Sequence, residues 1–171
     1  LNSSILQKDY LDRLGVDETI SQHVLDYKTN KGDKGFEFME ELFLVDGMTY
    51  DIYSMIKNYI TIYGGNDSRI NINTASENVL QIVVGDNKLV QDILEYRKGA
   101  DGKEGTNDDG IFENTADIST KIRGLNSALF TVVSNFFRIS AEASFSEDKK
   151  IIKKITSVVD RSGKIYYWKE D

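Results

Sequence analysis

The chain has 171 residues and a mass of 19.4 kDa, with 40% apolar and 29% charged side chains, a balance typical of a folded protein with a substantial core. Its net charge of −7 opposes binding to polyanions such as nucleic acids. The sequence contains no cysteine and a single histidine, His23, which excludes disulfides, zinc–thiolate centres and cysteine nucleophiles. We therefore do not expect an enzyme, and we interpret His23 as a surface or packing residue.

An internal duplication is the most informative feature of the sequence. Short blocks of the first half recur in the same order in the second half, about 70 residues later. The paired blocks are 2–4 with 73–75, 24–28 with 93–97, 36–37 with 112–113, 47–49 with 124–126, and 58–62 with 135–139. The separation widens where the second copy carries a longer loop, residues 99–110. We interpret the chain as two copies of one helical unit.

Each copy has the pattern of paired short helices. Apolar residues at helical spacing predict the pairs 5–14 with 18–28, 38–45 with 50–57, 77–84 with 86–98, and 115–122 with 126–133. A polar residue that can cap the second helix stands in each connection, namely Asp17, Thr49, Asp86 and Asn126. Each pair is therefore predicted to be a helix-hairpin-helix.

Strands are expected in two places. Short β-prone runs at 59–63 and 69–72 predict a β-hairpin between the helical repeats, because turn residues join them. From residue 135 onward, apolar and polar residues alternate, which predicts an antiparallel meander with one buried face. The predicted fold class is α+β. Its expected parts are a first helical repeat at 1–58, the β-hairpin at 59–73, a second helical repeat at 74–134, and the C-terminal β-meander at 135–171.

The loop 99–110 is the candidate metal site. Its aspartates supply oxygen ligands and its glycines let the backbone aim carbonyls inward, which suits a hard cation such as Ca²⁺. The spacing is not that of an EF-hand, and an acidic turn without metal is the alternative. The candidate ligands are the side chains of Asp101, Asp108 and Asp109, with Glu113 or Glu104 to complete the shell and main-chain oxygens near Lys98 and Thr106.

The helical hairpins raise a second hypothesis, DNA binding. DNA-binding hairpins usually leave backbone N–H groups free at the start of the second helix, where they meet a phosphate. In this chain the four capping side chains would occupy those donors, and two of them, Asp17 and Asp86, add negative charge. We expect no nucleic-acid partner.

Blocks distributed over nearly the whole chain carry a family resemblance. They are residues 41–49, 60–64, 70–76 with 79–80, 96–97, 109–113, 155–161 and 165–168. In this order they resemble the minor pseudopilin K of type II secretion systems, the general secretion pathway protein K family. The run Ile-Asn-x-Asn-Thr-Ala also opens competence-type DNA-binding hairpins, so a competence-like DNA-binding protein is the alternative, and a calcium-dependent surface adhesin is a third.

The resemblance implies a pilin-like antiparallel sheet into which a large α-helical domain, built from duplicated helix-hairpin-helix (SAM-like) units, is inserted. It implies a structural protein at the tip of the pseudopilus, with minor pseudopilins I and J as partners and pseudopilin H as a further candidate, that serves the export of folded proteins. The domain would lie in the periplasm, monomeric when alone, anchored in the inner membrane by an apolar N-terminal helix that we expect upstream of Leu1. The resemblance also implies structural calcium, and the loop looks like the calcium loop of the major pseudopilin.

Overall fold

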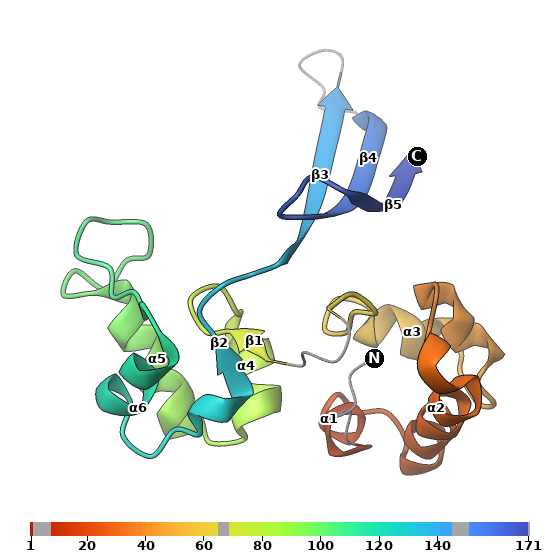
Figure 1. Cartoon of the computed structure of the whole chain (residues 1–171), viewed down its shortest axis with the longest axis horizontal. Helices are drawn as coiled ribbons and strands as arrows, with labels where there is room; N and C mark the ends of the chain where they lie inside the picture. The colour runs from red at the N-terminus through yellow and green to blue at the C-terminus, as the bar shows by residue number, and fades with distance from the viewer. Residues whose placement is uncertain (2–7, 65–68, 145–150, 171) are drawn as a thin grey trace. The chain divides into compact units, whose positions relative to one another are not determined.

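The computed structural model describes residues 1, 8–64, 69–144 and 151–170. The chain forms two compact units, residues 1–132 (unit 1) and 133–171 (unit 2) (Figure 1). Unit 1 is helical apart from one short pair of strands, and unit 2 is a three-stranded antiparallel sheet. The predicted α+β class is confirmed.

The first half of unit 1 consists of short helices. Its elements are α1 (Lys8–Arg13), α2 (Glu18–Lys31), the 3₁₀-helices η1 (Gly32–Lys34) and η2 (Met39–Leu44), and α3 (Tyr50–Ile56). The helix predicted at 38–45 is therefore present as a 3₁₀-helix, and α2 extends three residues beyond its predicted end. The beginning of the helix predicted at 5–14 lies outside the described residues.

The second half of unit 1 repeats this arrangement with one short pair of strands. Its elements are β1 (Ile70–Asn71), α4 (Glu77–Val84), α5 (Asn87–Lys98), α6 (Thr115–Lys121), the 3₁₀-helix η3 (Ser127–Leu129) and β2 (Phe130–Thr131). The prediction of α4 is confirmed at both ends. The helix predicted at 126–133 is wrong, because the chain makes one 3₁₀ turn there and then extends into β2.

The β-hairpin predicted at 59–73 is also wrong. Residues 60–64 form no strand, and β1 pairs in parallel with β2, with Ile70 opposite Phe130 and Asn71 opposite Thr131. The turn predicted between the two runs falls largely outside the described residues. The β-prone run at 69–72 therefore finds its partner about 60 residues later in the chain, inside the second repeat.

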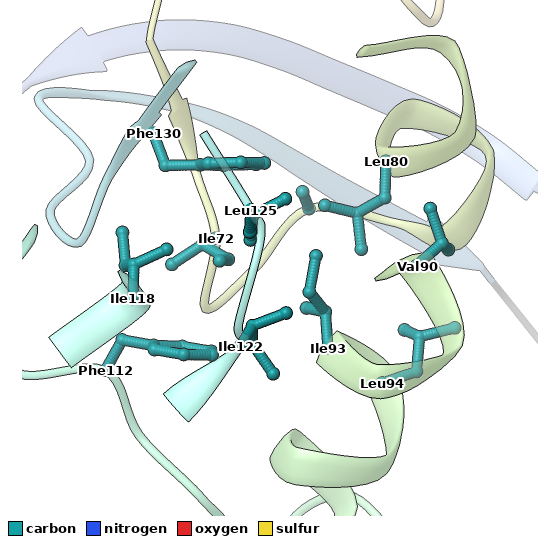
Figure 2. Packing of buried hydrophobic residues seen from close by; sticks show 11 residues of the cluster. Ile72, Leu80, Val90, Ile93, Leu94, Phe112, Ile118, Ile122, Leu125 and Phe130 are labelled. Atoms are coloured by element: carbon teal, nitrogen blue, oxygen red, sulfur yellow. The ribbon is translucent and has the colours of Figure 1, made fainter. Parts of the chain in front are cut away.

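Each repeat has its own hydrophobic core. The core of the second repeat contains Ile72, Ala75, Leu80, Val90, Ile93, Leu94, Phe112, Ile118, Ile122, Leu125 and Phe130, and Figure 2 shows these side chains converging between the helices. The core of the first repeat contains Leu1, Leu11, Val16, Val24, Phe36, Leu42, Val45, Ile56 and Ile62. The two clusters share no residue, so each half of the duplication buries its own apolar face.

Equivalent contacts recur in the two repeats. The rings of Tyr27 and Phe36 are stacked with centroids 5.2 Å apart, and those of Tyr96 and Phe112 are 4.6 Å apart. The two pairs come from blocks that the sequence aligns. A second contact also recurs. In the first repeat the backbone N–H of Glu37 donates to the carboxylate of Glu41 (2.7 Å), and in the second repeat the backbone N–H of Glu113 donates to the carboxylate of Asp117 (3.1 Å). These geometries support a structural duplication.

The sequence alignment of 58–62 with 135–139, the last pair of blocks, is wrong. The backbone N–H of Ile72 donates to the carbonyl of Thr131 at 3.0 Å, and in the first repeat the amino group of Leu1 donates to the carbonyl of Thr61. The structural counterpart of 60–62 is therefore 130–132, where Ile-Thr-Ile corresponds to Phe-Thr-Val. The block at 135–139, which the sequence paired with 58–62, belongs to unit 2.

Unit 2 consists of strands β3 (Phe136–Ser144), β4 (Ile151–Asp160) and β5 (Ile165–Glu170) in the order β3-β4-β5. Both pairings are antiparallel, which confirms the predicted meander, and each contains one irregularity in register. The connection between β3 and β4, where the polar run Ser146-Glu147-Asp148 predicts a turn, lies outside the described residues.

The predicted burial of one sheet face is wrong for this chain. Residues directly opposite each other on neighbouring strands share a face, and the pairings group on one side the residues Phe137, Ile139, Ile155, Val159, Ile165 and Trp168. The same side also carries Ser157 and, beside Ile155, the ion pair of Lys153 with Glu170. We call this side the apolar sheet face. Phe137, Ile139, Ile165 and Trp168 are all exposed, and among the described residues of unit 2 only Ser157 and Val158 are buried. The alternation found in the sequence is thus present, but no residue of unit 2 that the structure describes covers the apolar side.

Candidate functional site

The acidic loop between α5 and α6 is closed at its base by backbone contacts. The carbonyl of Tyr96 accepts hydrogen bonds from the N–H groups of Gly99 (3.4 Å) and Gly110 (3.2 Å). A Cβ on Gly99 would lie 2.2 Å from the carbonyl oxygen of Asp108, and a Cβ on Gly110 would lie 2.1 Å from that of Tyr96. Both glycines are therefore needed because the backbone approaches itself closely at these points.

Asp108 and Asp109 organise the interior of the loop. One carboxylate oxygen of Asp108 accepts from the backbone N–H groups of Ala100 (2.7 Å) and Asp101 (2.9 Å). One carboxylate oxygen of Asp109 accepts from the backbone N–H of Gly105 (2.6 Å). The hydrogen bond from the Thr106 hydroxyl and those from the backbone hold the pKa of Asp108 below its usual value. An ordinary aspartate is already ionised at neutral pH, so the effect of these hydrogen bonds on Asp108 is to extend its ionised form to lower pH.

The hydroxyl of Thr106 lies among several acceptor oxygens. Its Oγ1 is 2.7 Å from Oδ1 of Asp108, 3.2 Å from Oδ1 of Asp109 and 3.3 Å from the carbonyl oxygen of Lys103. A hydroxyl carries one hydrogen and can satisfy one of these acceptors at a time. The site therefore gathers two carboxylate oxygens, a hydroxyl and a carbonyl with fewer donors than acceptors. These four oxygens are of the type that Ca²⁺ prefers, and fewer than the six to eight that it usually takes.

The other predicted ligands lie elsewhere. Asp101 accepts from the N–H of Lys103 at 2.8 Å, and Glu104 pairs with Arg97 at 2.9 Å. Lys98 is the last residue of α5, and Glu113 lies beyond the base of the loop, where its N–H binds Asp117. The predicted set is thus only partly brought together. Asp108 and Asp109 meet at the hydroxyl of Thr106, whereas the main-chain oxygen of Thr106 accepts from the N–H of Asp109 at 3.4 Å.

The sequence pointed to main-chain oxygens near Lys98 and Thr106, whereas the structure places the carbonyl of Lys103 beside the Thr106 hydroxyl. Residue type alone does not show which backbone oxygen turns inward. Within the described ranges, no group of three or more His, Cys, Asp or Glu side chains is placed to hold a metal ion. A cation here would therefore rely on two carboxylates and on neutral oxygens from the hydroxyl and the backbone.

The predicted capping of the helical hairpins is confirmed. The side chains accept from backbone N–H groups at the start of the next helix, with Asp17 bonded to Thr19 (2.8 Å), Thr49 to Ile52 (3.3 Å), Asp86 to Lys88 (2.8 Å) and Asn126 to Ala128 (3.1 Å). The donors that a DNA phosphate would use are engaged by the protein's own side chains.

Glu41 has the most strongly shifted carboxyl group described. Burial opposes its ionisation, but Lys31 at 2.6 Å, the N–H groups of Glu37 and Phe38 and the hydroxyl of Tyr27 outweigh it and lower the pKa of Glu41 to about 2. These partners come from α2 and from the start of η2. The arrangement ties η2 to α2, which is a structural role and not an acid–base one.

No family model matches the chain, and neither a curated protein nor a solved structure matches it. In the part of the chain that the structure describes, no helix is both long and apolar enough to cross a membrane.

Proposed function

We propose that this chain is the periplasmic part of a minor pseudopilin of type K, a structural protein of the type II secretion pseudopilus. The proposal rests on the blocks that resemble this family and on the combination of a large helical unit, built from duplicated hairpins, with a small antiparallel sheet. In this reading the helical unit is the inserted domain and β3–β5 belong to a pilin-like sheet.

The apolar sheet face is the observation that carries the proposal. A three-stranded sheet normally covers an apolar face with a helix or a second sheet, whereas Phe137, Ile139 and Trp168 are exposed here. The family resemblance implies an apolar N-terminal helix, and in this proposal that helix covers the face. The exposed side chains therefore fit a sheet that receives an apolar helix, and they do not fit a self-sufficient adhesin domain.

The proposed role is that of a cap. A filament subunit needs one surface for the subunit below and another for the subunit above. Unit 1 comprises residues 1–132 and unit 2 only residues 133–171, and a helical part of that size would obstruct continued stacking. The partners in this proposal are minor pseudopilins I and J, with H as a further candidate.

Calcium binding by the acidic loop is part of the proposal. Asp108, Asp109, Thr106 and the carbonyl of Lys103 would hold the ion, and its charge would satisfy the surplus of acceptor oxygens around the Thr106 hydroxyl. The ion would fix the loop and has no catalytic task. The loop is exposed, so the ion would exchange readily with the surroundings.

Mixing the chain with the soluble domains of pseudopilins I and J tests the proposal. We expect a discrete hetero-complex by size-exclusion chromatography with light scattering, and a monomer for the chain alone. Open-ended homopolymers, or no interaction with either partner at high micromolar concentration, would contradict the capping role. Salt-sensitive retardation of duplex DNA at low salt would instead favour the competence-like alternative.

A further inference from the structure

An exposed apolar patch lies on η2 and α3 in the first repeat. The side chains of Leu44 and Tyr50 are each 70% exposed, and that of Phe43 is 43% exposed. The ring of Phe43 contacts that of Tyr53 with centroids 4.7 Å apart, and Tyr50 precedes Tyr53 by one helical turn. Phe43, Tyr50 and Tyr53 therefore adjoin, and Leu44 follows Phe43 in the chain. We call these four residues the η2–α3 patch.

The duplication supplies an internal control for this patch. Leu42 and Ile118 are equivalent and fully buried, so the two helices are anchored in the same way. The next two residues are Phe43 and Leu44 in the first repeat but Ser119 and Thr120 in the second. Tyr50, the first residue of α3, likewise corresponds to Ser127. The fold thus accepts hydroxyl side chains at these positions, and packing within the repeat does not require the apolar ones.

The segment that carries the patch has charges of one sign. Residues 35–56 contain five acidic residues and no Lys or Arg, the acids being Glu37, Glu40, Glu41, Asp46 and Asp51. Lys31 pairs with Glu37 and Glu41 from outside the segment, whereas Glu40, Asp46 and Asp51 are exposed. An occupant of this surface gains from positive charge at its rim, because complementary charges steer association and exclude wrong partners.

We propose that the η2–α3 patch binds a partner protein whose contact surface is apolar with Lys or Arg at its rim. A second copy of this chain is disfavoured by the like charge of the segment and by the net charge of −7. Anionic lipid is disfavoured for the same reason. The inference goes beyond the proposed pseudopilus role and stands on the patch and its charges alone.

A pair of synthetic helical peptides tests the inference on the full chain. Both peptides carry the same leucine stripe, and the flanking positions are all lysine in one and all glutamate in the other. We expect the lysine peptide to bind, with affinity that falls as salt rises, and the glutamate peptide not to bind. The readout is the fluorescence anisotropy of the labelled peptide.

Variants taken from the second repeat locate the binding site. Leu44→Thr combined with Tyr50→Ser is expected to weaken the lysine peptide about tenfold or more, and adding Phe43→Ser to abolish binding. Ile111→Ser is the matched control, because this side chain is 64% exposed in the second repeat, and it is expected to leave binding unchanged. Circular dichroism verifies that each variant is folded, and the Leu44 and Tyr50 changes remove little packing.

Several outcomes would overturn the inference. Equal binding of both peptides, equal weakening by Ile111→Ser, or no binding of the lysine peptide would each do so. Self-association in sedimentation that the patch variants abolish would assign the surface to a second copy of the chain. Binding to vesicles with anionic lipid that the patch variants abolish would assign it to a membrane. None of these readouts uses pseudopilins I or J, so failure here is distinguishable from failure of the proposed function.

Discussion

Replacement of Phe112 by alanine tests whether the second repeat is held together by its own core. Phe112 is 1% exposed and belongs to the cluster of the second repeat. Removal of a buried Phe side chain costs about 3–5 kcal/mol, since both transfer free energy and cavity formation contribute. We expect a loss of that size in the free energy of unfolding of unit 1.

The variant Phe112→Leu distinguishes the contribution of the aromatic ring contact to stability from that of the buried apolar volume. Leucine fills much of the space but loses the contact with the ring of Tyr96 at 4.6 Å, so we expect a cost of about 1 kcal/mol. The equivalent substitutions at Phe36 are expected to have similar effects, because Phe36 is 2% exposed and stacks on Tyr27. The double leucine variant is expected to be additive within about 0.5 kcal/mol, since the two clusters share no residue.

Urea unfolding followed by circular dichroism at 222 nm is the assay, because the helices of the described chain lie in unit 1. The single tryptophan, Trp168, lies in β5 and reports unit 2 separately. A cost below about 1 kcal/mol for Phe112→Ala would refute the reasoning, as would a strongly non-additive leucine double variant. If the alanine variant does not fold, the leucine series still decides the question.

Further predictions concern the acidic loop and Glu41. We expect a chelator to lower the melting temperature of the chain, because an ion bound only by the folded state stabilises that state by mass action. The double variant Asp108→Asn with Asp109→Asn is expected to abolish the difference. Identical melting curves with calcium and with chelator would mean that the loop is an acidic turn without metal. Gly110→Ala is expected to destabilise the base of the loop, because its Cβ would overlap the carbonyl of Tyr96. The measurement is limited proteolysis, and we expect the Gly110→Ala variant to be cleaved within 99–110 faster than the control variant Lys103→Ala. The pKa of Glu41 is lowered to about 2, so its stabilising contribution is complete above its unfolded value near 4.5 and is lost as pH falls toward 2. Glu41→Gln should therefore flatten the pH dependence of the melting temperature in that window, and an unchanged acid limb would contradict the assignment.

Local signals in the sequence predicted much of the helical structure. Ser76 and Gly85 bound α4 at both ends, with Ser76 accepting from the N–H of Val79 and Gly85 adopting a left-handed conformation, and such capping is encoded within a few residues. The pairing of β1 with β2 was not predictable in this way. It depends on residues far apart in the chain, and the nearby run at 59–63 offered a plausible local partner that the structure does not use.

In the candidate loop, too, the sequence predicted the local composition but not which residues meet. The aspartates and glycines indicated an oxygen-rich site, but side-chain type does not specify which oxygens meet. Asp108 and Asp109 converge on Thr106, whereas Glu104 is drawn to Arg97 and Glu113 lies beyond the base of the loop. The backbone oxygen that joins the two aspartates is that of Lys103, whereas the sequence pointed to main-chain oxygens near Lys98 and Thr106.

The uncovered sheet leads to a final prediction about the stability of unit 2. Apolar burial stabilises local structure, and regions with little of it open at low free energy. Among the described residues of unit 2 only Ser157 and Val158 are buried, whereas helix α5 alone buries Val90, Ile93 and Leu94.

We therefore expect the amide hydrogens of β4 to exchange at least about tenfold faster than those in the middle of α5, a difference of about 1.4 kcal/mol in opening free energy. The comparison is fair because β4 is the central strand and is hydrogen-bonded on both sides. Hydrogen exchange followed by mass spectrometry resolves the two segments. Equal protection of β4 and α5 would mean that the sheet is stable without a cover, and the exposed Phe137, Ile139 and Trp168 would then no longer argue for a helix packed on this face.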